Sequence, residues 1–245
     1  MKEFDDLLGG GLDRGTTTLI LGTAGTGKST LAMQYATQMG AKGEHGILFV
    51  FDETREIMLA RAKALGLDLE PHIQNGFITV QQVDPAELSP GEFATRIRDR
   101  VDRGCGLVVI DSLNGYLNAM PGEQYLNSQL HELTSYCNQQ GVVTILILAQ
   151  HGLVAAAEAP VDLSYLSDTV VNMRYFEAAG EVRQSVAVIK KRSGHHEKTL
   201  REFRLESGKG IWVGQPLKEF HGVLTGMPVF HGAAQEMLSV ADANK

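Results

Sequence analysis

The chain contains few cysteines and no long apolar run. Of its 245 residues only Cys105 and Cys137 carry thiols, too few and too far apart for a disulfide framework or a C-x-x-C site. No run of about 18 apolar residues occurs, so we expect no membrane-spanning helix. The opening stretch MKEFDDLLGGG is acidic and lacks the apolar core of a signal peptide. These absences predict a cytoplasmic protein whose two thiols are small buried groups in a reducing compartment.

The chain also has fewer basic than acidic residues. The 22 Lys and Arg residues are outnumbered by 29 Asp and Glu residues, which gives a formal net charge of -7. This balance disfavours a general binder of nucleic acid, because such a protein needs clustered positive charge. The remaining composition, 43% hydrophobic and 21% charged, is that of an ordinary globular protein with length enough for one large domain or two small ones.

Strand-like apolar runs alternate with helical patterns over the first 150 residues. The strand-like runs are TTTLILG from Thr16, GILFVFD from Gly46, FITVQQV from Phe77, GLVVIDS from Gly106 and VVTILILAQ from Val142. The helical patterns include TREIMLARAKALG from Thr54 and EQYLNSQLHELTSYCNQQG from Glu123. Near-continuous apolar strands that alternate with helices predict a parallel sheet covered on both faces, which is a doubly wound α/β fold.

The pattern changes after about Asp168. Two pairs of strand-like runs follow, with turns at Ala179-Gly180 and at Ser207-Gly208. We expect two antiparallel hairpins on one edge of the parallel sheet. Residues 1–231 are predicted to form one domain, and residues 232–245 a C-terminal tail to which we assign no function.

A glycine-rich segment joins the first predicted strand to a predicted helix. It fits the pattern G-x-x-x-x-G-K-[ST] from Gly22 to Ser29, in which backbone N–H groups surround phosphate oxygens. Lys28 would then reach the β- and γ-phosphates, and the Ser29 hydroxyl would hold Mg²⁺. The competing interpretation is a glycine-rich turn with a chance lysine. The predicted nucleotide-binding residues of this loop are Thr23, Ala24, Gly25, Thr26, Gly27, Lys28, Ser29 and Thr30.

Polar residues follow three other predicted strands. Asp111 ends an apolar run, where it would face the Ser29-bound Mg²⁺ as a Walker B acid, and Gln150 ends another. Gln150 would sense the γ-phosphate, or it is a plain strand-terminal residue. Asp52 and Glu53 follow a third run, and one of them would accept the proton of the attacking nucleophile. They could instead cap the helix that begins near Thr54, and the sequence does not distinguish the two acids.

A basic run, KKRSGHHEKTLREFR, begins at Lys190. By itself it is typical of a solvated hairpin edge, and the adjacent His195 and His196 lack the partners of a metal site. However, phosphoryl transfer commonly uses an arginine, and no arginine lies on the strand ends that surround the predicted phosphate loop. The basic run is therefore a candidate source of that arginine.

Taken together, these motifs resemble the RecA-type ATPase superfamily and, within it, the KaiC family of circadian clock proteins. The likeness covers about residues 4–230 and depends on LLGGGLDRGTTTLILGTAGTGKST, FVFDE, VVIDS, GVLTGMP and, most specifically, the stretch from Asp168 to Phe203. The resemblance implies a RecA-like fold and a homohexameric ring that holds Mg-ATP between subunits. It also implies a clock-type signalling role with regulatory partner proteins.

The same resemblance assigns roles to individual residues. It implies that the acidic pair Asp52-Glu53 supplies the catalytic base, although two glutamates are usual in the family. It implies that Lys190 and Arg192 reach the γ-phosphate of a neighbouring subunit. The phosphorylated serine of the family's autokinase domain falls on Ser164, whereas the next position departs from the expected threonine.

Other functions fit the sequence less well. A DNA-dependent ATPase of the RecA/RadA recombination class shares the same core, but the segment GLVAAAEAPVDLSY, where a DNA-facing loop would lie, is acidic and alanine-rich. A small-molecule kinase would need a substrate pocket and lid that no segment indicates. A dinucleotide oxidoreductase is disfavoured because the glycines do not follow G-x-G-x-x-G.

Overall fold

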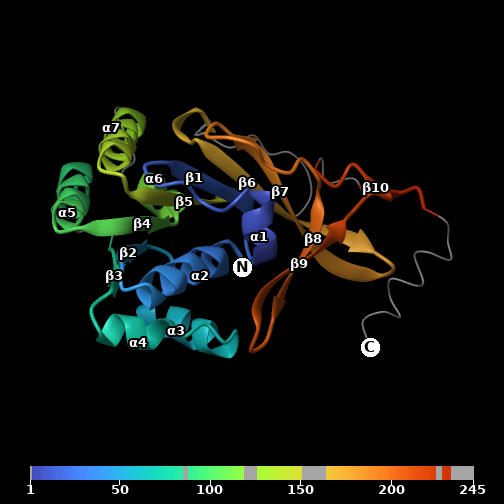
Figure 1. The fold of residues 1–245 in the computed structure, drawn as a ribbon, viewed down its shortest axis with the longest axis horizontal. Helices are drawn as coiled ribbons and strands as arrows, with labels where there is room; N and C mark the ends of the chain where they lie inside the picture. Colours follow the sequence, from blue (N-terminus) through green and yellow to red (C-terminus); the bar gives the residue numbers. More distant parts are fainter. Residues whose placement is uncertain (1, 85–87, 119–125, 151–163, 225–227, 233–245) are drawn as a thin grey trace.

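The structure is a computed structural model, and it describes residues 2–84, 88–118, 126–150, 164–224 and 228–232. Its centre is a nine-stranded sheet in the order β3-β2-β4-β5-β1-β6-β7-β8-β9 (Figure 1). The strands are β1 Thr17–Thr23, β2 His45–Val50, β3 Ile78–Gln82, β4 Cys105–Asp111, β5 Val143–Gln150, β6 Thr169–Ala178, β7 Glu181–Lys191, β8 Arg201–Glu206 and β9 Gly210–Pro216. A second, two-stranded sheet pairs β10 Phe220–His221 with β11 Val229–Phe230.

The strands from β3 to β6 in this order run parallel, and those from β6 to β9 are antiparallel neighbours. The two predicted hairpins are confirmed, since β6 and β7 join at Ala179-Gly180 and β8 and β9 join across Ser207–Lys209. They extend one edge of the parallel sheet, as expected. The predicted doubly wound α/β core is likewise confirmed.

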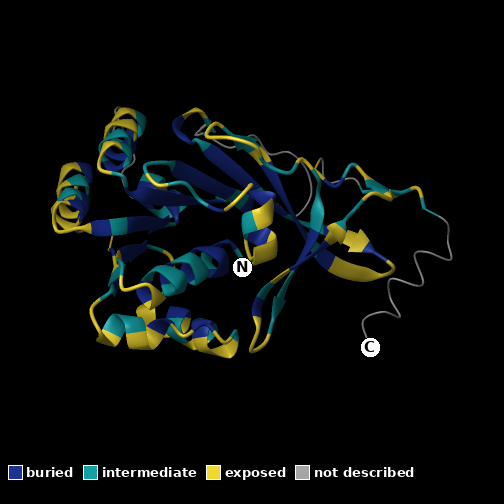
Figure 2. Cartoon of the chain, in the orientation of Figure 1, coloured by how far each residue is buried: buried dark blue, intermediate teal, exposed yellow. Residues whose placement is uncertain are grey.

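Helices cover both faces of the parallel part of the sheet (Figure 1). On one side lie α2 Lys28–Ala41, α3 Arg55–Ala64 and α4 Leu69–Gln74, and on the other α5 Pro90–Asp102, α6 Leu113–Asn118 and α7 Leu126–Gln139. Neighbouring strand residues divide between two apolar clusters: Ile20 and Leu48 pack with α2, whereas Leu19 and Ile47 pack with α5 and α7. Figure 2 shows the result, a buried sheet between helices whose outer faces are exposed.

Two helix starts have clear local causes. The Thr54 side chain accepts a hydrogen bond from the Ile57 N–H at 3.4 Å, so Thr54 caps α3. Ser89 and Glu92 form a reciprocal capping box at the start of α5, with Pro90 as the first helical residue. Since Thr54 supplies the α3 cap, the acids before it are available for other contacts.

The N-terminal helix α1 Lys2–Leu7, which the sequence analysis did not anticipate, is attached to the end of β7. The Lys191 side chain is only 4% exposed, and its Nζ donates hydrogen bonds to the carbonyls of Leu8 and Gly11 and pairs with Asp13 at 3.0 Å. A helix of six residues is too short to be stable by itself, so the burial of Phe4 and Leu7 in the core and the Lys191 contacts with the following segment hold it in place. The segment 151–163 and the tail 233–245, both named in the sequence analysis, lie outside the described residues.

Candidate nucleotide-binding site

The predicted phosphate loop lies between the end of β1 and the start of α2. Gly27 occupies the N-cap position of α2 with a φ of 96°, a left-handed conformation that favours glycine. A Cβ at Gly22 would come within 2.2 Å of the Met173 carbonyl oxygen on β6, so only glycine allows this close approach. The Thr26 hydroxyl donates to the Thr23 carbonyl at 2.9 Å and closes the loop. Ala24 and Gly25 form its exposed tip.

The loop lysine points inward. Lys28 is buried, and its Nζ donates to the Thr23 carbonyl across the loop at 2.6 Å. Burial lowers the pKa of Lys28 from 10.5 to about 8, and the charge of Asp111 works in the opposite direction. The ammonium group therefore lies under the loop, against the Thr23 carbonyl, where a bound phosphate chain would supply negative charge.

Ser29 and Asp111 meet at the carboxyl edge of the sheet. Burial raises the pKa of Asp111 from 3.8 to about 6, and a hydrogen bond with the Ser29 side chain opposes this shift. The charge of Glu53 raises the pKa of Asp111 further, whereas the charges of Arg61 and Lys28 lower it. A hydroxyl and a carboxylate beside a phosphate loop form the oxygen donor set that Mg²⁺ uses, so the residues present fit this ion.

The two neighbouring acids, Asp52 and Glu53, have different partners. Asp52 is exposed and accepts a hydrogen bond from the Ser112 hydroxyl. Glu53 accepts two hydrogen bonds from Arg61 on α3, at 2.8 Å and 2.6 Å. Glu53 also acts electrostatically on Asp111, so its carboxylate lies near the Ser29–Asp111 pair.

Gln150 ends β5 beside the loop, because it is the register partner of Thr23. The strand end is also tied to α6: the Asn114 amide donates to the Ala149 carbonyl at 2.9 Å and accepts from the Ala149 N–H at 2.7 Å. These contacts place Gln150 at the same edge as Asp111 and Lys28. The structure thus brings together the loop, Asp111, the acidic pair and Gln150.

Lys190 and Arg192 lie elsewhere in the chain. The Lys190 Nζ donates to the carbonyls of Ser164 and Ser167 at 2.8 Å and 2.7 Å, and Arg192 donates to the Tyr165 carbonyl at 3.1 Å. Strand register places this cluster toward the other edge of the sheet from the loop, since Lys190 pairs with Val170, and Val170 pairs with Leu19 on β1. Leu19 lies three residues before Gly22, which is about 10 Å at roughly 3.3 Å per residue, so the two clusters are separate within one chain.

A family model described as "ATPase: KaiC" matches residues 1–218. The chain belongs to the KaiC ATPase family. It is 26% identical over 231 residues to "Circadian clock protein KaiC3" of Synechocystis sp., which covers 94% of this chain and 45% of that protein. It is 24% identical over 228 residues to "Circadian clock oscillator protein KaiC" of Synechococcus elongatus, covering 92% and 44%. The chain thus spans about half the length of the curated relatives it matches, and the predicted family is confirmed.

Three residues of this KaiC-family site were not foreseen: Arg61, Ser112 and Asn114. A signal for Arg61 was present, because Arg61 lies seven residues after Thr54, or about two helical turns, and therefore on the same face of α3 as the helix start. Ser112 directly follows Asp111, so it shares the strand end. Asn114 carried no such signal, because its partner Ala149 lies 35 residues away.

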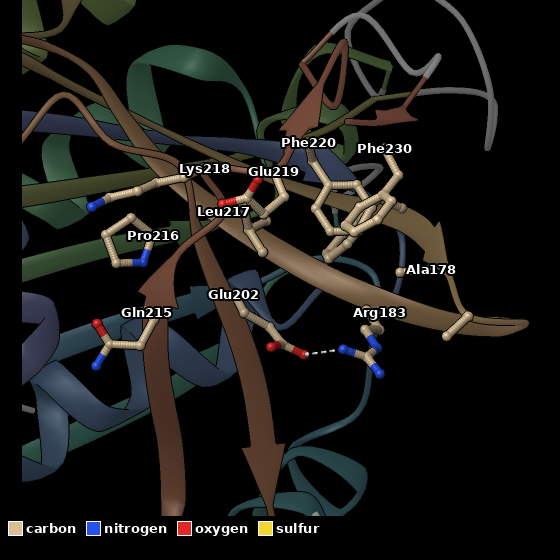
Figure 3. Close-up of a pocket in the computed structure, with 12 residues that line it drawn as sticks. Ala178, Arg183, Glu202, Gln215, Pro216, Leu217, Lys218, Glu219, Phe220 and Phe230 are labelled. Atoms are coloured by element: carbon tan, nitrogen blue, oxygen red, sulfur yellow. Dashed lines mark ion pairs between the residues drawn. The ribbon is translucent and has the colours of Figure 1, made fainter. Parts of the chain in front are cut away.

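A cavity of about 150 Å³ lies away from the phosphate loop, between the β6–β7 hairpin and residues 215–220 (Figure 3). Its walls include Phe176, Phe220 and Phe230. The ring centroids of Phe176 and Phe220 are 5.4 Å apart, and those of Phe220 and Phe230 are 5.2 Å apart. Its two buried charges, Arg183 and Glu202, are 3.9 Å apart and face each other (Figure 3). Each of these charges also has a closer partner, since Arg183 pairs with Glu181 at 3.0 Å and Glu202 with Arg204 at 2.6 Å.

Among the described helices, none has the length and apolar character of a membrane span.

The pKa of Asp111 predicts that this residue destabilises the nucleotide-free protein at neutral pH. The pKa of Asp111 is higher in the folded protein than in the unfolded chain. The free energy of unfolding is therefore highest below about pH 4, where Asp111 is protonated, and it falls as the pH rises through about 6. Asp111→Asn removes the buried charge and should raise the free energy of unfolding by about 1–3 kcal/mol at pH 7.5. Chemical denaturation without Mg²⁺ at pH 7.5 and pH 4 measures this, and the difference should nearly vanish at pH 4.

The matched control is Asp99→Asn on the exposed face of α5, which should change the free energy of unfolding by less than about 0.5 kcal/mol at either pH. An Asp111→Asn protein less stable than the parent at pH 7.5 would contradict the prediction.

Proposed function

We propose that the chain binds and hydrolyses ATP with Mg²⁺, and that a neighbouring copy completes each site in a homohexameric ring. The observation that carries the proposal is the meeting of Lys28, Ser29 and Asp111 at one edge of a parallel sheet in a KaiC-family chain. We place this activity in a cytoplasmic, clock-type signalling protein with regulatory partner proteins, whose ATPase domain spans residues 1–231 and whose tail spans residues 232–245. The names of the relatives support the clock role.

In this proposal the loop backbone and Lys28 bind the β- and γ-phosphates, and Ser29 and Asp111 hold Mg²⁺. Mg²⁺ neutralises phosphate charge when bound. Glu53 orients a water molecule and accepts its proton as the water oxygen bonds to the γ-phosphorus and the bond to the β–γ bridging oxygen breaks. Glu53 is favoured over Asp52 because Glu53 acts electrostatically on Asp111, whereas Asp52 is exposed and bound to Ser112. Gln150 contacts the γ-phosphate or the water.

The separation of the two clusters supports the ring. Lys190 lies about 10 Å along the sheet from the loop of its own chain, so in this proposal Lys190 and Arg192 serve the γ-phosphate of a neighbour. Arg192 is suited to this role, since its side chain is 53% exposed and its ion pair with Asp168 is long, at 3.7 Å.

Incubation with γ-labelled ATP and Mg²⁺ tests the hydrolysis. The parent protein should release labelled phosphate, and Lys28→Ala should lose both ATP binding and turnover. Glu53→Gln should bind ATP but lose about 10²–10⁴-fold in turnover, whereas Asp52→Asn should lose less than about tenfold. Unchanged ATP affinity of Lys28→Ala by calorimetry would contradict the site. Turnover that rises with added single-stranded DNA would favour the recombination-type ATPase instead.

Mixing two inactive variants tests the ring. Arg192→Ala retains the loop and Lys28→Ala retains the arginine, so in mixed rings roughly a quarter of the interfaces combine an intact loop with an intact arginine. We expect the mixture to recover turnover that neither variant shows alone. Mixed hexamers confirmed by mass that show no recovery would mean that Arg192 acts only within its own chain.

Serine autophosphorylation is the second candidate function. The specific observation is that the Ser164 carbonyl accepts from Lys190, the residue assigned to the neighbour's γ-phosphate, so the serine lies beside that cation. In the transfer the Ser164 hydroxyl oxygen bonds to the γ-phosphorus, ADP leaves, and a carboxylate of the neighbour's acidic pair takes the proton.

Phosphopeptide mapping after incubation with Mg-ATP tests this second function. Phosphate should appear on Ser164, disappear in Ser164→Ala and remain in Tyr165→Phe, because the longer tyrosine places its hydroxyl several ångströms farther from the backbone. Steady hydrolysis without any phosphoprotein would leave the ATPase alone.

A further inference from the structure

Arg61 and Glu53 form a two-point ion pair beside the candidate site. The guanidinium Nη1 and Nη2 donate to the two carboxylate oxygens at 2.8 Å and 2.6 Å. The Glu53 side chain is 17% exposed and that of Arg61 is 35% exposed. A bidentate pair of this kind restricts orientation as well as distance, because both N–H···O bonds must be satisfied at once.

Arg61 lies on helix α3, which is capped at its start and packed against the core. Helix α3 begins at its Thr54 cap, and Met58 and Ala62 are buried in the core on either side of Arg61 in sequence. The Arg61 Nε is buried and has no hydrogen-bond partner among the described residues, so the two bonds to Glu53 determine how the guanidinium lies. Glu53 precedes the helix and has no comparable support of its own.

The electrostatics show what the pair does for the site. Glu53 and Asp111 carry like charges and interact with each other, while the positive charge of Arg61 acts on Asp111 with the opposite sign. The repulsion between the two carboxylates is partly offset by Arg61, so without Arg61 it would be stronger, and Glu53 would lose its partner at a largely buried position. The side chain would then turn toward solvent, away from the Ser29–Asp111 pair.

We propose that Arg61 is a positioning residue that holds the Glu53 carboxylate at the edge of the sheet where the attacking water binds. This inference rests on the proposed ATPase function. Arg61 acts through Glu53 and does not touch the nucleotide. It is an arginine supplied from within the chain, distinct from Arg192, which serves the neighbour.

Steady-state kinetics with Mg-ATP separate this role from the alternatives. Arg61→Gln should lower kcat by about 10-fold to 100-fold and leave KM within about twofold, because only the positioning of the base is lost. Arg61→Lys should recover part of kcat, since an ammonium keeps the charge but not the two-point contact. In a Glu53→Gln background, Arg61→Gln should change kcat by less than about twofold, because the residue it acts through is gone.

Controls and readouts besides turnover complete the design. Arg55→Gln, on the exposed first turn of α3, should leave kcat and KM unchanged. Binding of a fluorescent ATP analogue and the thermal midpoint are measured for every variant. If Arg61→Gln does not fold, Arg61→Lys carries the same comparison in both backgrounds.

Each contrary result has its own meaning. A parent protein without ATP turnover would overturn the proposed function and this inference with it. An active parent with an equally active Arg61→Gln would overturn the inference alone. An equal loss of kcat in the Glu53→Gln background would show that Arg61 acts independently of Glu53, and a weakened affinity for the ATP analogue would show direct contact with the nucleotide. Either of these would also overturn it.

Discussion

Burial of the parallel sheet on both faces is the constraint from which the arrangement of the site follows. Strand residues such as Leu19 and Ile20 point into two different apolar clusters, so no face of these strands is free for polar chemistry. Polar side chains can therefore leave the sheet only at the strand ends. Parallel strands bring their carboxyl ends to one edge, and this edge collects Asp111, Gln150 and the phosphate loop.

The same constraint separates the chain's charges into two groups. Lys190 and Arg192 leave β7 at the opposite end of the sheet, where they bind the backbone carbonyls of residues 164–167. The glycine-rich loop thus lies at one edge of the chain and a cationic group at the other. In the ring that we propose, head-to-tail association of identical copies would join the two kinds of edge, and such heterologous contacts close into rings when the rotation between copies permits.

Local patterns in the sequence predicted the fold well, but they did not predict contacts between residues that lie far apart in the sequence. The alternation of apolar runs predicted the five core strands and the two hairpins because each signal is contained in a few consecutive residues. The phosphate loop was predictable for the same reason. Helix α5 could also have been found, since Ser89 and Glu92 have capping-box spacing. In contrast, α1 depends on burial of Phe4 and Leu7 in the core, and Lys191 binds the segment that follows it, so no local pattern near Lys2 records these contacts.

Two pairs of adjacent residues, Lys190-Lys191 and Asp52-Glu53, show what could not be predicted from the sequence. Alternation along a strand predicts that Lys190 and Lys191 point to opposite sides, but not that Lys191 binds the segment after the N-terminal helix. Asp52 and Glu53 were likewise interchangeable until Ser112 and Arg61 were seen to bind one each. For Lys191 and for Asp52 the deciding partner lies far away in the sequence. The partner can be recognised only once the fold has brought the two together.

The charges at the carboxyl edge form a set that is balanced for ligand binding rather than for stability. Burial works against the charged forms of both Lys28 and Asp111, since it lowers the pKa of the lysine and raises that of the aspartate. The Arg61–Glu53 pair adds one charge of each sign close by, so this pair leaves the balance between Lys28 and Asp111 unchanged. A phosphate chain and a divalent cation would give both buried groups the partners that water cannot supply. In the proposed function, the free energy lost in burying these two groups would be recovered when the nucleotide and Mg²⁺ bind, so binding would stabilise this edge of the sheet.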